Sequence, residues 1–414
     1  MNTQPGTAPD PKARVTQPLQ AAPVDRPHVS GGAAGARIRF NRNELAGAFG
    51  DMGTDIPLLI GVTLACGLDA TSVLVMFGLM QVFTGLSYRM PMPVQPLKAM
   101  AAIVISQQVT AAQLHGAGLA IGLVMLLLAL TGMLDWLGRV VPKCVIRGIQ
   151  LGLGLQLAGV ALGKFVLSDG AMGYVLALAA FVATVALLGN RRFPAALAVV
   201  VMGLVYAFAF NLEGDALASS LGFHLPSLAS FSPADMATGF VVLALPQIPL
   251  SLCNSVLATR QLAVDLFPER PLSIKRIGLT YAVMNLVNPW FGGVPTCHGS
   301  GGMAGHFAFG GRTGGSVVIY GALLVTCGLF LGTGFDHVVK AFPLPMLGVL
   351  LLFEALALIW LIRDVVGEAN GFPVTVLVGL VAAGLPYGYV IGLIAGTVLW
   401  RLGRRARLVS PDAP

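Results

Sequence analysis

Between about residues 44 and 402 the chain is a succession of long apolar runs separated by short polar breaks. Most runs approach the roughly 20 residues that a helix needs to cross the hydrocarbon core of a bilayer. The pattern therefore predicts an all-α polytopic membrane protein. Its 14 predicted transmembrane segments are 44–66, 70–88, 93–109, 113–136, 142–163, 171–189, 193–211, 237–259, 273–291, 295–309, 314–334, 339–361, 371–385 and 387–402.

These segments form two similar sets of seven. Prolyl breaks begin the third segment of each set, and related prolyl openings at 141–146 and 342–347 begin the fifth. An odd number of spans per repeat places the repeats in opposite orientations, as in inverted-repeat secondary transporters. The expected divisions are a disordered cytoplasmic tail (1–40), a first repeat (41–212), an extracellular or periplasmic linker (213–236), a second repeat (237–402) and a cytoplasmic tail (403–414).

The distribution of Lys and Arg predicts the orientation. With the N-terminus in the cytoplasm, the two tails hold ten basic residues, the inner loops and adjacent span ends twelve, and the outer loops only Lys164 and Lys340. Cytoplasmic loops of membrane proteins carry this excess. We expect a multi-pass protein of the cell (inner or plasma) membrane, with both termini cytoplasmic.

Composition narrows the function classes. Only 10% of residues are charged, against about 25% in soluble domains. The net charge of +7 is scattered between apolar runs, which argues against a nucleic-acid partner. The five cysteines form no Cys-x-x-Cys pair, so neither a disulfide framework nor a metal knuckle is expected. We find no nucleophile–base pair and no nucleotide fingerprint, and expect neither an enzyme nor a cofactor.

Two broken stretches are the main candidates for a binding site. Residues 91–98 read PMPVQPLK, and residues 292–302 read GGVPTCHGSGG. Proline interrupts a helix but suits its first turn. Each stretch therefore predicts extended backbone that leads into a short helix with free amide donors at its N-terminus. Two such helix starts aimed at one point would bind a small anion.

In the first break, Gln95 offers a neutral amide donor and Lys98 a positive charge inside a span. Lys98 could balance a substrate dianion, pair with Asp51, Asp55 or Glu354, or extend along its helix to a wet surface. We assign Gln95 and Lys98 to the substrate site.

Two carboxylates, Asp51 and Asp55, flank Thr54 near the start of the first span, and Glu354 lies in the twelfth. Charged groups within a membrane usually face a cavity or a partner. The three carboxylates are candidates for binding a coupling cation, and Thr54 is a candidate for the substrate site. The alternatives are helix capping for the aspartates and an ion pair with Arg147 for Glu354.

In the eighth span Gln247 and Asn254 are seven residues apart and share a helix face if the nearby prolines do not rotate it. Such amides either line a pocket or join helices, at about 0.6–2 kcal/mol per hydrogen bond. Gln247, which lies between two prolines, is the better candidate for the pocket.

The second break offers the hydroxyls of Thr296 and Ser300 and a close backbone approach at Gly299. We include Cys297 and His298 with them in the substrate site. Two adjacent ligands do not make a metal site, so none is expected. The alternative for this glycine-rich stretch is tight helix packing.

At these residues the chain resembles a known family. The sequences GDMGT at 50–54 followed by Pro57, PVQPLKA at 93–99, and PL at 249–250 with NS at 254–255 are similar to the molybdate transporter branch of the sulfate permease (SulP) superfamily. The resemblance implies fourteen spans in two inverted sets of seven, a core domain and a gate domain. It also implies anion binding between the third and tenth spans, and it allows a homodimer.

We therefore expect an importer of molybdate that works by alternating access, in which the core moves against a gate formed by spans five to seven and twelve to fourteen. Neutral donors and two positive helix ends suit a tetrahedral oxyanion. Molybdate, tungstate and sulfate share geometry and charge, so the choice of molybdate depends on the resemblance. The alternatives are a permease for sulfate or another divalent anion and, on the same fold, an anion channel.

Overall fold

The computed structural model describes residues 37–107, 109–187, 195–211 and 222–406. The chain divides into Met1–Ala36 and Arg37–Pro414, and only the second unit contains described residues. Most of the predicted tail 1–40 therefore lies outside the described residues, as do parts of the predicted linker 213–236 and of the tail 403–414.

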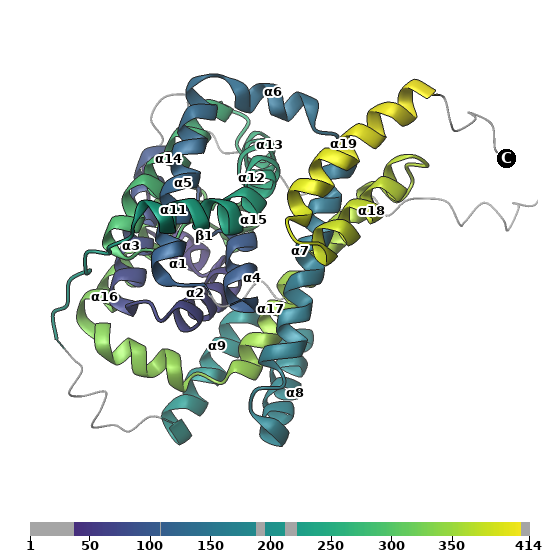
Figure 1. Ribbon diagram of the computed structural model, residues 1–414. Helices are drawn as coiled ribbons and strands as arrows, with labels where there is room; N and C mark the ends of the chain where they lie inside the picture. The colour runs from purple at the N-terminus through teal and green to yellow at the C-terminus, as the bar shows by residue number, and fades with distance from the viewer. Residues whose placement is uncertain (1–36, 108, 188–194, 212–221, 407–414) are drawn as a thin grey trace, which may run out of the picture. The chain divides into compact units, whose positions relative to one another are not determined.

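The first half of the described chain consists of helices and one short strand (Figure 1). Asp69 accepts a hydrogen bond from the backbone of Ser72 at 2.9 Å, and Thr110 forms a capping box with Gln113. These caps fix where two of the helices begin. The elements are α1 (Arg42–Ala48), α2 (Met52–Cys66), α3 (Ala70–Tyr88), β1 (Val94–Pro96), α4 (Lys98–Ser106), α5 (Ala111–Leu130), α6 (Met133–Val140), α7 (Lys143–Val160), the π-helical turn η2 (Ala161–Phe165), α8 (Gly170–Ala186), α9 (Ala195–Tyr206) and the π-helical turn η3 (Ala207–Asn211).

The second half of the described chain also consists of helices and one short strand. Glu44 of α1 accepts hydrogen bonds from the backbone of Thr313 and Ser316, at 2.9 and 3.0 Å, and so holds the start of α16. The elements are α11 (Pro233–Gly239), η4 (Phe240–Ala244), α12 (Leu245–Leu250), η5 (Ser251–Ala258), α13 (Thr259–Leu266), α14 (Ile274–Val287), η6 (Asn288–Phe291), β2 (Thr296–His298), α15 (Ser300–Ala308), α16 (Gly315–Ala341), α17 (Leu344–Trp360), η7 (Leu361–Asp364), α18 (Gly371–Gly384) and α19 (Gly388–Ala406).

Each predicted segment coincides with a helix or with a strand that leads into a helix. The first segment differs in being broken between α1 and α2, where glycine and aspartate interrupt the helix. The fourth ends at Leu130, and α6 is a separate helix. The eighth runs from Pro233 to Leu266 through two π-helical turns on either side of its prolines.

The helices are apolar enough for a membrane. Among the described residues, five helices have the length and hydropathy of a complete span, and six shorter apolar helices accompany them. The predicted all-helical membrane architecture is thus supported. The number of 14 spans and the inverted repeat stay predictions.

The two broken stretches meet in a two-stranded antiparallel ribbon. Val94 pairs with His298, Gln95 with Cys297 and Pro96 with Thr296. The sequence predicted extended backbone at both places but not their pairing. Because β1 and β2 are buried throughout, the ribbon lies inside the protein.

Glycines bring α3 and α16 into close contact. A Cβ at Gly78 would lie 2.6 Å from the carbonyl oxygen of Gly321, and a Cβ at Gly85 would lie 2.7 Å from that of Gly314. Side chains at these positions would force the helices apart. Small residues at such crossings are typical of membrane helices.

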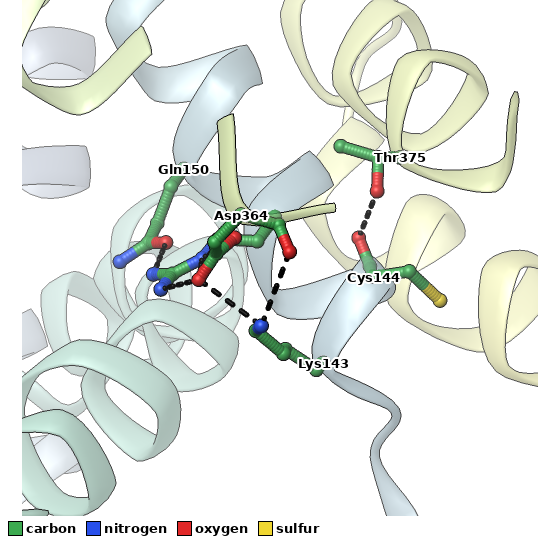
Figure 2. Close-up of polar contacts among 6 residues, drawn as sticks. Lys143, Cys144, Gln150, Asp364 and Thr375 are labelled. Carbon is green, nitrogen blue, oxygen red and sulfur yellow. Dashed lines mark hydrogen bonds and ion pairs between the residues drawn. The ribbon is translucent and has the colours of Figure 1, made fainter. Parts of the chain in front are cut away.

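A second group of helices, α7, α18 and α19, packs together (Figure 1). Figure 2 shows Asp364 beside Lys143, and the Thr375 hydroxyl donating to the carbonyl of Cys144 at 2.8 Å. Asp364 also accepts from Arg147, with Nε–Oδ1 at 3.0 Å. The predicted alternative of an ion pair between Arg147 and Glu354 is therefore wrong, because the Arg147 guanidinium pairs with Asp364 instead.

Candidate functional site

The ribbon places the starts of α4 and α15 next to each other. Helix α4 begins at Lys98, two residues after β1 ends, and α15 begins at Ser300, two residues after β2 ends. Both helices have nine residues. The backbone nitrogen of Leu97 donates to the carbonyl of Pro295 at 3.1 Å, which continues the link between the strands toward the start of α4.

The start of α4 is already capped by a side chain from the eighth predicted span. The amide oxygen of Gln247 accepts hydrogen bonds from the backbone of Ala99 and Met100, at 2.9 and 3.2 Å. Its nitrogen donates to Ser251 at 3.1 Å. We expected free backbone amide donors at this helix start. For the N–H groups of Ala99 and Met100 the expectation is wrong, because both donate to Gln247.

The start of α15 is more open. Its first residue is preceded by Gly299, which makes no side-chain capping bond. A Cβ on Gly301 would meet no atom within 4 Å. The Ser300 hydroxyl reaches Asn254 at 3.4 Å. Gly299 therefore leaves this start without a side-chain cap, but the Asp51 carboxylate lies close to it, because a Cβ on Gly302 would overlap that carboxylate.

Gln95 lies at the centre of the ribbon and is fully buried. Its amide nitrogen donates to Asp51 at 2.7 Å, and its oxygen has no hydrogen-bond partner among the described residues. A Cβ on Gly299 would overlap the Gln95 side chain. The glycine therefore allows Gln95 to lie against the start of α15.

Lys98 forms an ion pair with Glu354 of α17, and Thr54 donates to the same carboxylate at 3.1 Å. The side chains of the pair are 7% and 15% exposed. Of the three carboxylates that could have paired with Lys98, the structure selects Glu354. The contact joins α2, α4 and α17.

The other two carboxylates are more deeply buried. Asp51 and Asp55 are 2% and 0% exposed. Both oxygens of Asp55 and one of Asp51 have no hydrogen bond of normal length among the described residues, although Tyr320 approaches Asp55. With Glu354 they make three carboxylates around one ammonium group.

The residues of β2 hold the ribbon in place. The backbone N–H of Thr296 donates to the Asn285 side chain, and the Thr296 carbonyl accepts from that side chain. The Thr296 hydroxyl accepts a hydrogen bond from Asn288 at 3.3 Å. The His298 ring contacts the Thr280 hydroxyl at 2.7 Å. Cys297 is buried opposite Gln95. These polar groups are thus engaged within the protein.

A chain of polar contacts connects the site with the ion pairs of Figure 2. Arg147 donates to Gln150 at 2.8 Å, and Gln150 lies 3.5 Å from Asn254, which also contacts Ser300. Gln247 thus contacts the start of α4, and Asn254 contacts Ser300 at the start of α15.

Several residues that build this site were not predicted from the sequence. Gln81, Asn285, Ser251 and Tyr281 are buried and hydrogen-bonded beside the ribbon. The available signal was an isolated polar side chain within an apolar run, which occurs at many other positions of this chain.

Comparisons with known proteins agree on the family. A profile described as "Molybdate transporter of MFS superfamily" matches residues 43–157 and 239–358. Molybdate transporter 2 of Arabidopsis thaliana is 34% identical over 410 residues, with 87% of each chain covered. Molybdate transporter 1 of the same plant is 32% identical, with 88% of each chain covered.

Solved structures share the fold at low identity. The transmembrane domain of the cyanobacterial bicarbonate transporter BicA gives a TM-score of 0.63 at 17% identity, over 88% of this chain and 98% of that one. The murine anion transporter Slc26a9 in the inward-facing state gives 0.67 at 12% identity, over 90% and 69%. These likenesses show that the chain shares the fold of these two transporters. The named relatives are transporters, in agreement with the expectation that the protein is not an enzyme.

Proposed function

Because the chain belongs to the molybdate transporter family, we propose that it imports molybdate across the cell membrane by alternating access. The observation that carries the proposal is the antiparallel pairing of β1 with β2, from which both short helices begin. Helix N-termini carry partial positive charge and attract anions. The oxyanion is held between these two starts.

The two starts contribute differently to this site. Ser300 and the backbone donors after Gly299 bind the oxyanion directly, because the start of α15 has no side-chain cap. Gln95 offers its second amide hydrogen, and Lys98 offers its charge. Gln247 supports the site from behind by capping α4.

The remaining predicted residues support these groups. Thr54 orients Glu354, which pairs with Lys98. Thr296, Cys297 and His298 form β2 and hold its position.

The charges favour coupling to a cation. Asp51, Asp55 and Glu354 outnumber Lys98 around the site. At a separation of about 5 Å and an effective dielectric constant of about 20, each unit charge repels another of the same sign by about 3 kcal/mol. A dianion therefore binds more favourably when protons or another cation neutralise these carboxylates.

In alternating access, the contacts between the core helices and the gate helices must break. Following the family resemblance, α7–α9 and α17–α19 are the gate and the other spans the core. The pair of Lys98 with Glu354 crosses this boundary. Lys164 of η2 also crosses it, donating to the carbonyls of Ile105 and Ser106 at 3.0 and 2.7 Å. The equal lengths of α4 and α15 favour the inverted repeat.

Uptake of labelled molybdate into proteoliposomes tests the site. We expect the double substitution of Gln95→Ala with Gln247→Ala to abolish uptake, because it removes a donor and the cap of α4. Gln261→Ala, an exposed amide that donates to Asp265, serves as the control. Unchanged uptake by the double variant would exclude this site.

Calorimetry on the purified protein with molybdate, tungstate, sulfate and uracil tests the substrate. Binding of molybdate without uracil is expected. Sulfate that binds more tightly than molybdate would favour a sulfate permease instead. Uncoupled current in a planar bilayer would favour an anion channel.

A further inference from the structure

The outer edges of the central ribbon are closed by side chains and not by further strands. A two-stranded ribbon pairs its strands along one edge each and leaves the other edge of each strand without a partner. In a membrane protein such backbone groups must find partners within the protein. In this protein an amide side chain binds one residue on the outer edge of each strand.

Gln81 of α3 closes the edge of β1. Its nitrogen donates to the carbonyl of Val94 at 2.8 Å, and its oxygen accepts from the backbone nitrogen of Val94 at 2.9 Å. Gln81 is fully buried. The Gln81 side chain thus forms hydrogen bonds with both the N–H and the carbonyl of one strand residue.

Asn285 of α14 does the same on the edge of β2. Its nitrogen donates to the carbonyl of Thr296 at 2.6 Å, and its oxygen accepts from the backbone nitrogen of Thr296 at 2.9 Å. Asn285 is also fully buried. Gln81 and Asn285 precede the residues that they hold by 13 and 11 positions.

The two contacts occupy equivalent places. Gln95 faces Cys297 at the centre of the ribbon. Val94 comes one residue before this centre on β1, and Thr296 one residue before it on β2. An amide is the side chain that offers a donor and an acceptor in the planar arrangement of a peptide group. Glutamine and asparagine therefore replace a missing neighbouring strand on each side.

We propose that Gln81 and Asn285 are positioning residues, a pair of amide clamps that fix β1 and β2 and thereby aim the starts of α4 and α15 at the transported anion. Lys98 follows Val94 by only four positions, and Ser300 follows Thr296 by four. A strand that is released from its clamp therefore moves the helix start that follows it. The part of this proposal that concerns the anion rests on the proposed function, whereas the part that concerns the ribbon does not.

The test compares Gln81→Met and Asn285→Leu with a matched control. In the control, Gln156→Met, the lost amide of α7 also makes two hydrogen bonds, donating to the carbonyl of Ala382 at 3.2 Å and accepting from Tyr389 at 2.6 Å. Hydrogen–deuterium exchange is measured at the amides of Val94, Gln95 and residues 296–298, and the Kd for molybdate by calorimetry. Thermal melting of all variants shows whether their losses of stability are comparable.

We expect each clamp variant to accelerate exchange of its own strand and to raise the Kd for molybdate at least about tenfold. Gln156→Met should lower the melting temperature similarly but leave ribbon exchange and the Kd unchanged. Where Gln81→Met does not fold, Gln81→Asn keeps the amide but shortens its reach, and a smaller change in the same direction is expected.

Unchanged exchange at Val94 and Thr296 in the clamp variants would overturn the proposal. An equal rise in Kd for Gln156→Met would also overturn it, because general loss of stability would then explain the effect. If the parent protein binds no molybdate, the proposed function fails while exchange at the ribbon still decides whether the clamps act.

Discussion

The buried pair of Lys98 with Glu354 makes a quantitative prediction. Glu354 accepts from Lys98 and, at 3.1 Å, from Thr54, and the two side chains of the pair are only 7% and 15% exposed. Glu354→Gln keeps the volume of the side chain but removes the carboxylate charge that forms the ion pair with Lys98, while Asp51 and Asp55 stay nearby without contacting it. Removing one partner of a buried pair destabilises a protein by about 3–5 kcal/mol. Because the glutamine retains one acceptor, we expect a loss at the lower end of this range, about 3 kcal/mol.

Unfolding of the purified protein in mixed micelles, with thermal melting as a second measure, tests this value. Glu269→Gln is the control, because Glu269 contacts Arg270 at 3.6 Å with its side chain 47% exposed. Exposed pairs contribute about 0–1 kcal/mol. The double variant with Lys98→Met and Glu354→Gln removes both charges and should recover most of the loss.

Molybdate should then stabilise Glu354→Gln more than the parent, because a bound dianion supplies the missing counter-charge of Lys98. A ligand at 100 times its Kd stabilises a protein by about 2.7 kcal/mol. At the same molybdate concentration the variant should show a larger shift, and the double variant a smaller one. Equal stability of Glu354→Gln and the parent would refute the buried-pair argument. Equal molybdate shifts would refute the placement of Lys98 at the anion.

Two further predictions concern the helix starts, and a third concerns the end of α4. Gln247→Glu keeps an acceptor for the start of α4 but adds a negative charge beside the anion, so uptake should fall more than tenfold. The melting temperature should fall as well, because the buried carboxylate has no counter-charge and loses the hydrogen bond to Ser251. Gly299→Ala should abolish uptake because its Cβ would overlap Gln95, whereas Gly159→Ala, where a Cβ meets no atom within 4 Å, should transport normally. Lys164→Met removes the donor to the last carbonyls of α4, and unfolding should show a loss of about 0.5–1.5 kcal/mol per hydrogen bond.

The amino-acid sequence by itself determined the membrane architecture. Long apolar runs and prolines act over neighbouring residues, so their effect does not depend on the rest of the fold. The two broken stretches predicted extended backbone that leads into a short helix, and the structure has such helices beginning at Lys98 and Ser300. The motifs around Gln95 were specific enough to indicate the family.

Tertiary structure decided which partners the polar residues take. Lys98 had three carboxylates of similar sequence context, and α17 brings Glu354 to it. Gln247 caps α4 because the eighth span crosses this helix start. Gln81 and Asn285 are ordinary amides in apolar runs until β1 and β2 pair beside them. The physical reason is that a helix face has no partner until another element packs against it, and the sequence pattern does not specify which one does.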